Sequence, residues 1–345
     1  MTGHGLAALI KMRFPRWVLF GAVALVATAN GFNIGADLGS MAASVRLLVP
    51  LPEALLLVAM AGLMVGLEIL LPYERYAKVL RWLTLSLGAY IAVLFVIDVN
   101  WGNVLRQTLI PQGSWDRPMI AALIAILGTT ISPYLFFWQA SEEVEERHLK
   151  KDHAVDRAHL SLMRTDVLAG MASAVVVMFA IMVASAATLG RQGVTTVQTA
   201  QQAAEALQPI AGRLASLLFT LGIVGTGLLA VPVLAGSTAY ALSEAFGWPE
   251  GLGRKFGGAR GFYLVIAGAM LLRLALNFGG IDPIRGLYLA AILNGVAAPP
   301  LILLMLILSN HRLTCGTWTG PRWSNALVGL ALVLMTTLPI GYLVA

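Results

Sequence analysis

The chain has 345 residues, of which 58% are hydrophobic and 12% are charged, and its formal net charge is +6. A soluble domain carries about a quarter charged residues, so this composition excludes a water-soluble globular protein, and the apolar content excludes a disordered chain. The one cysteine, Cys315, excludes a secreted scaffold held together by disulfides. The apolar runs are continuous rather than alternating, which excludes a membrane β-barrel. We therefore expect an all-α protein that crosses a membrane several times.

Nine apolar stretches are long enough, or nearly so, to cross a bilayer, for which a helix needs about 20 residues. A short basic segment, residues 1–16, precedes them, and residues 17–345 form a single transmembrane domain. The first and sixth stretches exceed one crossing, so they must tilt, kink or protrude. The predicted spans are approximately 17–49, 53–71, 80–99, 118–140, 166–189, 214–245, 261–279, 284–309 and 324–343.

Lysine and arginine residues are distributed unevenly between the connecting segments. Most of them, such as Arg75, Lys150 and Arg254, lie in segments on the same side of the membrane as the N-terminus. Cytoplasmic loops carry the excess of positive charge in membrane proteins. The pattern therefore predicts a cytoplasmic N-terminus and, with nine spans, a C-terminus outside the cell. It also explains the positive net charge without a nucleic-acid partner.

The fourth stretch, residues 118–140, contains a predicted helix break. Pro133 lacks a backbone N–H and clashes with the carbonyl one turn earlier, at Thr129. Gly128 and three hydroxyl residues precede the proline, and irregular backbone at membrane depth must line a cavity or be packed in protein. The freed carbonyls and the hydroxyls of Thr129, Thr130 and Ser132 predict an oxygen-rich cation site. The alternative is a proline kink that serves packing alone.

Charged and polar residues also interrupt other stretches. Asp37 lies nine residues before Arg46 and Arg273 lies nine residues before Asp282, so each charge is about 13 Å from the same membrane boundary. Buried intramembrane charges are costly and are usually functional. We expect Asp37 and Arg273 to face one another or to share a wet cavity; a static ion pair is the alternative. One helical face carries Asn30, Asn33, Asp37, Ser40 and Ser44.

The remaining polar features are weaker signals. The run of small residues that ends at Pro232 favours a packing helix with a kink, whereas Asn294 in the eighth stretch can add an amide oxygen to a central site. The sequence lacks a glycine-rich phosphate loop with its lysine, so we expect no ATP site. No histidine lies in a predicted span, which disfavours an intramembrane enzyme.

Three stretches resemble the NRAMP family of divalent metal transporters. Residues 128–146, GTTISPYLFFWQASEEVEE, resemble its sixth helix, most closely in a divergent bacterial branch; residues 30–48 resemble the third helix and residues 226–240 the eighth. The resemblance implies a LeuT-type fold of two inverted five-helix repeats, with the first helix of each broken at the ion site. The nine spans then match the family's third to eleventh helices. The first two helices have no counterpart here, nor does the Asp-Pro-Gly-Asn stretch that supplies the family's metal ligands.

The chain also departs from the family at two positions. Ser132 stands where the family places a methionine, and a hard hydroxyl in place of a soft thioether predicts weaker discrimination against magnesium and calcium. Tyr134 stands where the family has a histidine linked to protons. The resemblance assigns the Thr129 carbonyl to the metal, Asp37 to an acidic position associated with proton passage, and Asn294 to a position near an amide of helix ten.

Together these observations predict a secondary transporter for divalent metal cations (manganese- or iron-like, or magnesium) in the bacterial inner membrane, driven by protons or another ion gradient. The metal ion is substrate, the lipid bilayer is the partner, and no cofactor is expected. Two alternatives stay open: a permease of the same fold for an organic cation or amino acid, and an inactive transporter fragment. Binding is predicted at Thr129, Thr130, Ser132 and Asn294, the ion pathway at Asp37, Asn33, Tyr134 and Arg273, and the break at Gly128 and Pro133.

Overall fold

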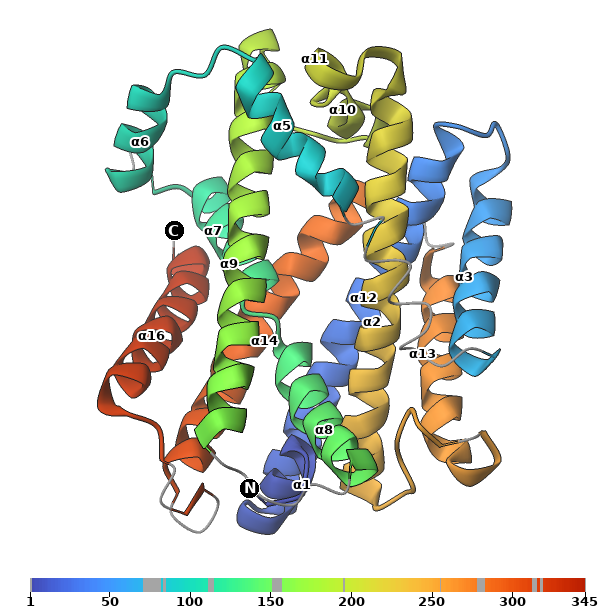
Figure 1. Cartoon of the computed structure of the whole chain (residues 1–345), viewed down its shortest axis with the longest axis vertical. Helices are drawn as coiled ribbons and strands as arrows, with labels where there is room; N and C mark the ends of the chain where they lie inside the picture. Colours follow the sequence, from blue (N-terminus) through green and yellow to red (C-terminus); the bar gives the residue numbers. More distant parts are fainter. Residues whose placement is uncertain are drawn as a thin grey trace.

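A computed structural model describes residues 2–70, 82, 85–110, 115–150, 157–194, 196–254, 256–277, 283–311, 315–316 and 319–344. The described chain is a bundle of helices with short connections (Figure 1). The helices are α1 (Leu6–Arg13), α2 (Arg16–Arg46), α3 (Glu53–Leu70), α5 (Gly88–Val96), α6 (Trp101–Leu109), α7 (Arg117–Thr130), α8 (Pro133–Lys150), α9 (Arg157–Thr188), α10 (Ala200–Glu205), α11 (Gln208–Ala211), α12 (Ala215–Phe246), α13 (Arg260–Asn277), α14 (Pro283–Asn310) and α16 (Arg322–Val344).

Six helical segments in the described part are long and apolar enough to cross a membrane: Arg16–Arg46, Arg117–Arg147, Leu160–Thr188, Gly212–Phe246, Pro283–Asn310 and Arg322–Val344. Shorter apolar helices, Glu53–Leu67 and Arg260–Leu271, occupy the second and seventh predicted spans. A chain with this many apolar helices is a multi-pass membrane protein. The third predicted span, 80–99, lies partly outside the described residues; its described part holds a short 3-10 turn, Leu85–Leu87, and α5.

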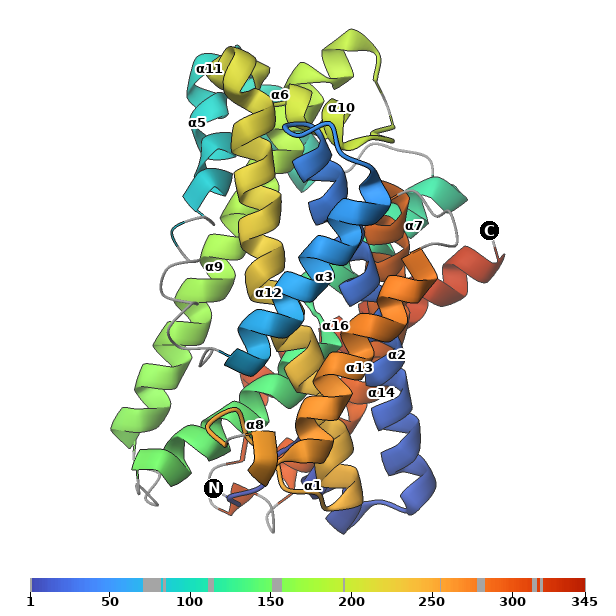
Figure 2. The same cartoon turned by 90° about the vertical axis from the view of Figure 1, so that its right-hand side faces the viewer.

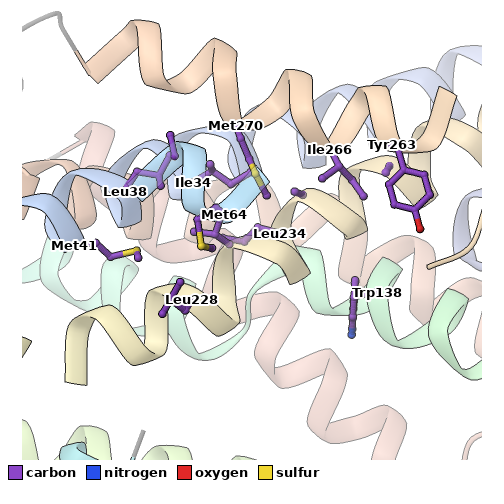
Figure 3. Close-up of a cluster of buried hydrophobic side chains, with 14 of the residues drawn as sticks. Ile34, Leu38, Met41, Met64, Trp138, Leu228, Leu234, Tyr263, Ile266 and Met270 are labelled. Carbon is purple, nitrogen blue, oxygen red and sulfur yellow. The ribbon is translucent and has the colours of Figure 1, made fainter. Parts of the chain in front are cut away.

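The helices pack around α2 and α12, the two long helices whose mutual contact is the most extensive in the bundle. On one side of this pair, α3 and α13 lie next to each other (Figure 2). The core between these four helices is built from apolar side chains that lie close together in Figure 3, including Ile34, Leu38, Met64, Leu234 and Ile266. On the other side, α14 packs against both α2 and α7, so the polar face of α2 is enclosed between α12 and α14.

Several element boundaries differ from the sequence-based expectation. The first span ends at Arg46, whose guanidinium pairs with Glu53 at 3.0 Å and closes the turn into α3. α12 continues as one helix through Pro232, the proline at which the sequence favours a kink. The basic N-terminal segment contains an additional helix, α1, which packs against α2, α8 and α12. The N-terminus therefore lies against the same end of the bundle as the end of α8 (Figure 1).

Candidate cation site at a broken helix

The break in the fourth span lies between α7, which ends at Thr130, and α8, which begins at Pro133. Ile131 leaves the helical conformation, with φ −109° and ψ 71°, and its N–H donates to the Leu127 carbonyl at 2.7 Å. Because Pro133 has no N–H, the Thr129 carbonyl loses its helical partner. The Ser132 hydroxyl lies 3.0 Å from that carbonyl oxygen and 3.1 Å from the Gly128 carbonyl oxygen. A serine directly before the proline therefore supplies the donor that the break removes.

Gly128 lies in the last turn of α7 rather than in the break where the sequence places it. A Cβ atom at this position would sit 2.5 Å from the backbone nitrogen of Gly295, and one at Gly295 would sit 2.6 Å from the Ile124 carbonyl oxygen. The two glycines thus let the backbones of α7 and α14 touch with no side chain between them. This contact fixes the carbonyl end of α7 against α14.

Two predicted site residues from distant parts of the sequence meet beside this contact. The Asn33 amide of α2 donates to the Asn294 side-chain oxygen at 2.9 Å, and Asn294 of α14 donates back to the Asn33 oxygen at 3.1 Å. Asn33 also donates to the Ala29 carbonyl at 2.8 Å. Each amide oxygen accepts one of these bonds and keeps a second lone pair. The pair therefore keeps acceptor capacity on two oxygens, and Asn294 directly precedes Gly295, the residue at which α14 touches α7.

Asn30 was not among the predicted site residues, although it lies one turn before Asn33 on the same face of α2. Its amide donates to the Leu234 carbonyl at 3.1 Å and to the Thr238 hydroxyl at 3.0 Å, both on α12. The side chain is fully buried, and its oxygen has no hydrogen-bond partner in the described part of the chain. Such an oxygen is costly unless a ligand or water uses it. Its regular spacing from Asn33 was the sequence signal that could have found it.

Asp37 continues the same face of α2 one turn beyond Asn33 and is partly buried. Among the described residues, no hydrogen bond or ion pair involves its carboxylate. The carboxylate lies close enough to Tyr134 to act electrostatically on the phenol. The side chain of Arg273 lies outside the described residues, so the expected pairing of Asp37 with Arg273 stays a prediction.

The hydroxyls of the two threonines in α7 bond to their own helix. Thr129 and Thr130 both donate to the Ile126 carbonyl, at 2.9 and 2.7 Å. Thr129 is exposed, whereas Thr130 faces α9, where its oxygen lies 3.8 Å from the Met178 sulfur. The two side chains therefore point in different directions, and the backbone carbonyls near Ser132 are the oxygens that the break itself provides.

Tyr134 lies in the first turn of α8 and connects the break to α12. Its carbonyl accepts a hydrogen bond of 2.8 Å from the Ser237 hydroxyl. Its ring lines an open hollow of about 370 Å³, together with Trp138 and Glu142 of α8 and Thr226 of α12. Tyr134 thus lies between the helix break and this partly polar hollow.

The middle of α8 is bound to α12 and α1 through a buried carboxylate that sequence reasoning missed. Glu244 of α12 accepts hydrogen bonds from the Ser141 hydroxyl of α8 at 2.7 Å and from the Ala8 N–H of α1 at 2.8 Å. Lys11 of α1 donates to the Ala245 carbonyl at 2.9 Å. A Cβ at Gly5 would sit 2.5 Å from the Ser141 oxygen, so α1 packs directly onto this group.

A second carboxylate, Glu145 of α8, holds the loop after α12. It accepts hydrogen bonds from the Tyr240 hydroxyl, from the Gly253 N–H at 2.6 Å and from the Leu252 N–H at 3.1 Å. Glu145, Glu244 and Glu250 line a cavity of about 450 Å³ at this end of the bundle. Burial, together with the nearby carboxylates of Glu244 and Glu145, raises the pKa of Glu250 to about 8, although Arg254 acts in the opposite direction. Within the described residues, no three acidic, histidine or cysteine side chains are arranged to hold a metal ion.

Comparisons with family models, with curated proteins and with solved structures all find relatives in the same protein family. The family model described as natural resistance-associated macrophage protein-like, Nramp, matches residues 1–345. The divalent metal cation transporter MntH of Caldanaerobacter subterraneus subsp. tengcongensis is 24% identical over 90% of this chain and 72% of its own length. MntH of Pectobacterium carotovorum subsp. carotovorum is 25% identical over 99% of this chain and 80% of its own length. A crystal structure of a mutant manganese transporter of Eremococcus coleocola has the same fold, with a TM-score of 0.68 at 17% identity, over 96% of this chain and 72% of that one.

Proposed function

Because the chain belongs to the NRAMP family, we propose that it is a secondary transporter that carries divalent metal cations across the cell membrane. The observation that carries this proposal is the break at Ile131–Ser132, which follows the end of α7 that packs on α14 at Gly295, the residue after Asn294 of the amide pair. Broken helices of this kind bind ions in many transporters. The relatives are named as metal transporters, which favours a metal ion over an organic cation or an amino acid.

In this proposal, the cation binds oxygen atoms around the end of α7. The Gly128 and Thr129 carbonyls already lack their helical N–H partners, and the Ser132 hydroxyl that bonds them can rotate its hydrogen away and present its oxygen to the ion. The amide oxygens of Asn33 and Asn294 have a second lone pair each. All of these donors are hard oxygens, which suit magnesium and manganese better than softer metals.

We further propose that Asp37 and Tyr134 line the route that the ion or a coupled proton takes. Asp37 lies on α2, which contacts α8, the helix that begins at the break and carries Tyr134 in its first turn. A carboxylate within the membrane is a candidate for an ion or proton pathway. With the N-terminus in the cytoplasm, as the loop charges indicate, inward movement of a divalent cation gains about 4.6 kcal/mol per 100 mV of membrane potential, twice the value for one charge. The membrane potential can therefore drive inward transport without ATP hydrolysis.

The function is tested by metal uptake into proteoliposomes that contain the full chain, with a potential that is negative inside. We expect manganese and magnesium to accumulate above the level of protein-free vesicles. Absence of uptake for every divalent metal tested, from protein that is still folded, would contradict the transport function. Uptake of an amine or amino acid instead would favour the same-fold permease.

The ligand set is tested separately with Ser132→Met, which introduces a thioether. We expect the variant to favour manganese over magnesium more strongly than the natural chain does, because sulfur binds the softer ion better. The control is Ser173→Met, because Ser173 is an exposed residue of α9 that donates to its own helix. An unchanged preference in Ser132→Met would remove Ser132 from the site.

A further inference from the structure

We propose that α6 is an interfacial anchor, a helix that lies at the membrane surface with its apolar side in the lipid acyl chains. The helix is at the end of the bundle opposite to α1, where it stands apart from the main body beside the upper part of α9 (Figure 1). The inference is independent of which substrate the protein carries.

The sequence of α6 separates apolar and polar residues onto two sides of the helix. At about 100° per residue, the side chains of Trp101, Val104, Leu105, Thr108 and Leu109 fall within an arc of about 140°. The opposite side carries Gly102, Asn103, Arg106 and Gln107. A short helix with this division is typical of segments that lie in the plane of a membrane surface.

Protein leaves Leu105 and Leu109 on the apolar side largely uncovered, whereas Val104 and Thr108 line a hollow beside α9. No residue of α6 is buried, and Leu105 and Leu109 keep 58% and 77% of their surface exposed. The helix shares a hollow of about 690 Å³ with α7 and α9, but its residues that line the hollow are Asn103, Val104, Gln107 and Thr108. The three largest apolar side chains are absent from that lining. They are all exposed, Trp101 the least at 46%.

The position of α6 along the bundle favours lipid as the occupant of this side. The hollow extends along α9 from Met178 to Ala187, just before α9 ends at Thr188. These residues belong to the last turns of an apolar span, so α6 lies at a membrane boundary. Trp101 and the exposed Trp115, which precedes α7, suit that depth because tryptophan concentrates at membrane interfaces. Arg106 on the polar side is placed to meet the headgroups.

A second protein is a poorer occupant. The helix has nine residues and is about 13 Å long, and only part of its circumference is apolar. A stable protein interface buries about 800 Å² on each partner, which such a strip does not provide. Lipid needs no minimum interface and gains from each apolar side chain that leaves water.

The test is site-directed spin labelling of the full chain in liposomes of phosphatidylcholine and phosphatidylglycerol. In a Cys315→Ser background, a nitroxide is attached to Leu105→Cys or Leu109→Cys on the apolar side, and to Asn103→Cys or Arg106→Cys as matched controls on the polar side. The accessibility of each label to two relaxing reagents is then measured separately. The reagents are oxygen, which concentrates in lipid, and a water-soluble nickel chelate.

We expect the ratio of oxygen to nickel accessibility to be several-fold higher at Leu105 and Leu109 than at Asn103 and Arg106. Equal access of the nickel chelate to all four positions would place the helix in water and overturn the proposal. Low access of both reagents at Leu105 and Leu109 would also overturn it, because a second copy or another protein segment would then cover the apolar side.

Discussion

Replacement of Gly128 by alanine tests the close contact that fixes the end of α7. The added Cβ would lie 2.5 Å from the Gly295 nitrogen, whereas ordinary van der Waals contact begins at 3.4 Å. The three obstructing atoms, this nitrogen, the Gly295 Cα and the Ala291 carbonyl oxygen, belong to the backbone of α14 and cannot rotate away. The helices must therefore separate by about 1 Å in a close-packed interior, and the Thr129 carbonyl moves with them.

The size of the effect follows from two opposing contributions. Overpacking of an interior typically costs about 1–3 kcal/mol, and the absence of any movable side chain puts Gly128→Ala at the upper part of that range. Alanine favours a helix over glycine by about 0.5–1 kcal/mol. The net expectation is a loss of about 1–2 kcal/mol. Gly21→Ala in α2 is the control, because no atom lies within 4 Å of its Cβ position, and only the favourable contribution remains.

Both variants are unfolded with sodium dodecyl sulfate in mixed micelles and followed by circular dichroism. We expect Gly128→Ala to unfold at lower detergent fraction than the natural chain and Gly21→Ala at equal or higher fraction. Manganese uptake should fall in Gly128→Ala even where the protein is folded, because the carbonyls of the break are displaced. If the two alanine variants unfold alike, the contact between α7 and α14 does not constrain the break as described.

Three further outcomes follow from hydrogen bonds and charge. Ser141→Ala removes a donor from the buried Glu244 carboxylate and should cost about 1.5–3 kcal/mol in the same unfolding assay; no loss would mean that water replaces the hydroxyl. Asn294→Leu removes the donor to the Asn33 side-chain oxygen and should cost about 1–3 kcal/mol, and a second replacement, Asn33→Leu, should recover part of that loss rather than add to it. The pKa of Glu250 is about 8 in the folded protein against 4.5 when exposed. Ionisation of Glu250 therefore lowers the stability of the folded protein as pH rises between these values. Glu250→Gln should raise the melting temperature above pH 8 and leave it unchanged below pH 4.5.

The helix break was predictable because its causes are local. Pro133 removes one N–H, and Ser132 directly before it offers a hydroxyl donor, so a short window of sequence contains the relevant chemistry. Proline alone was insufficient as a signal, since α12 continues through Pro232 and α14 through two consecutive prolines. At the break, the hydroxyl of Ser132 bonds the freed carbonyls and so stabilises the non-helical backbone.

The contacts at the α1 end were not predictable from the sequence for the opposite reason. The bond from Ala8 to Glu244 joins residues 236 positions apart, and that from Ser141 to Glu244 joins residues 103 positions apart. No periodicity or motif reports a pairing of that kind. Each residue looks ordinary in its own segment, a serine in the middle of α8 and a glutamate near the end of α12. Only the packing of α1, α8 and α12 gives them a shared role.

Ser132 has two opposite roles available, and one variant separates them. If its oxygen is a ligand, Ser132→Ala removes one donor and weakens metal binding. If its hydroxyl mainly occupies the Gly128 and Thr129 carbonyls, the same change frees them and strengthens binding. Ligands that bind only the folded state raise its stability with concentration, so the manganese-induced shift in unfolding midpoint measures the difference.

We expect a smaller manganese-induced shift in Ser132→Ala than in the natural chain, because the hydroxyl can turn its hydrogen away at little cost whereas a lost ligand has no replacement nearby. Without metal, the variant should be less stable by about 1–3 kcal/mol, since its buried carbonyls lose their donor. The metal-free stability is the control for the manganese-induced shift. A smaller shift with unchanged metal-free stability would mean that the Ser132 bonds to the two carbonyls are not formed. A larger shift would assign the hydroxyl the role of a competitor, and the site would then consist of the carbonyls and the amide pair alone.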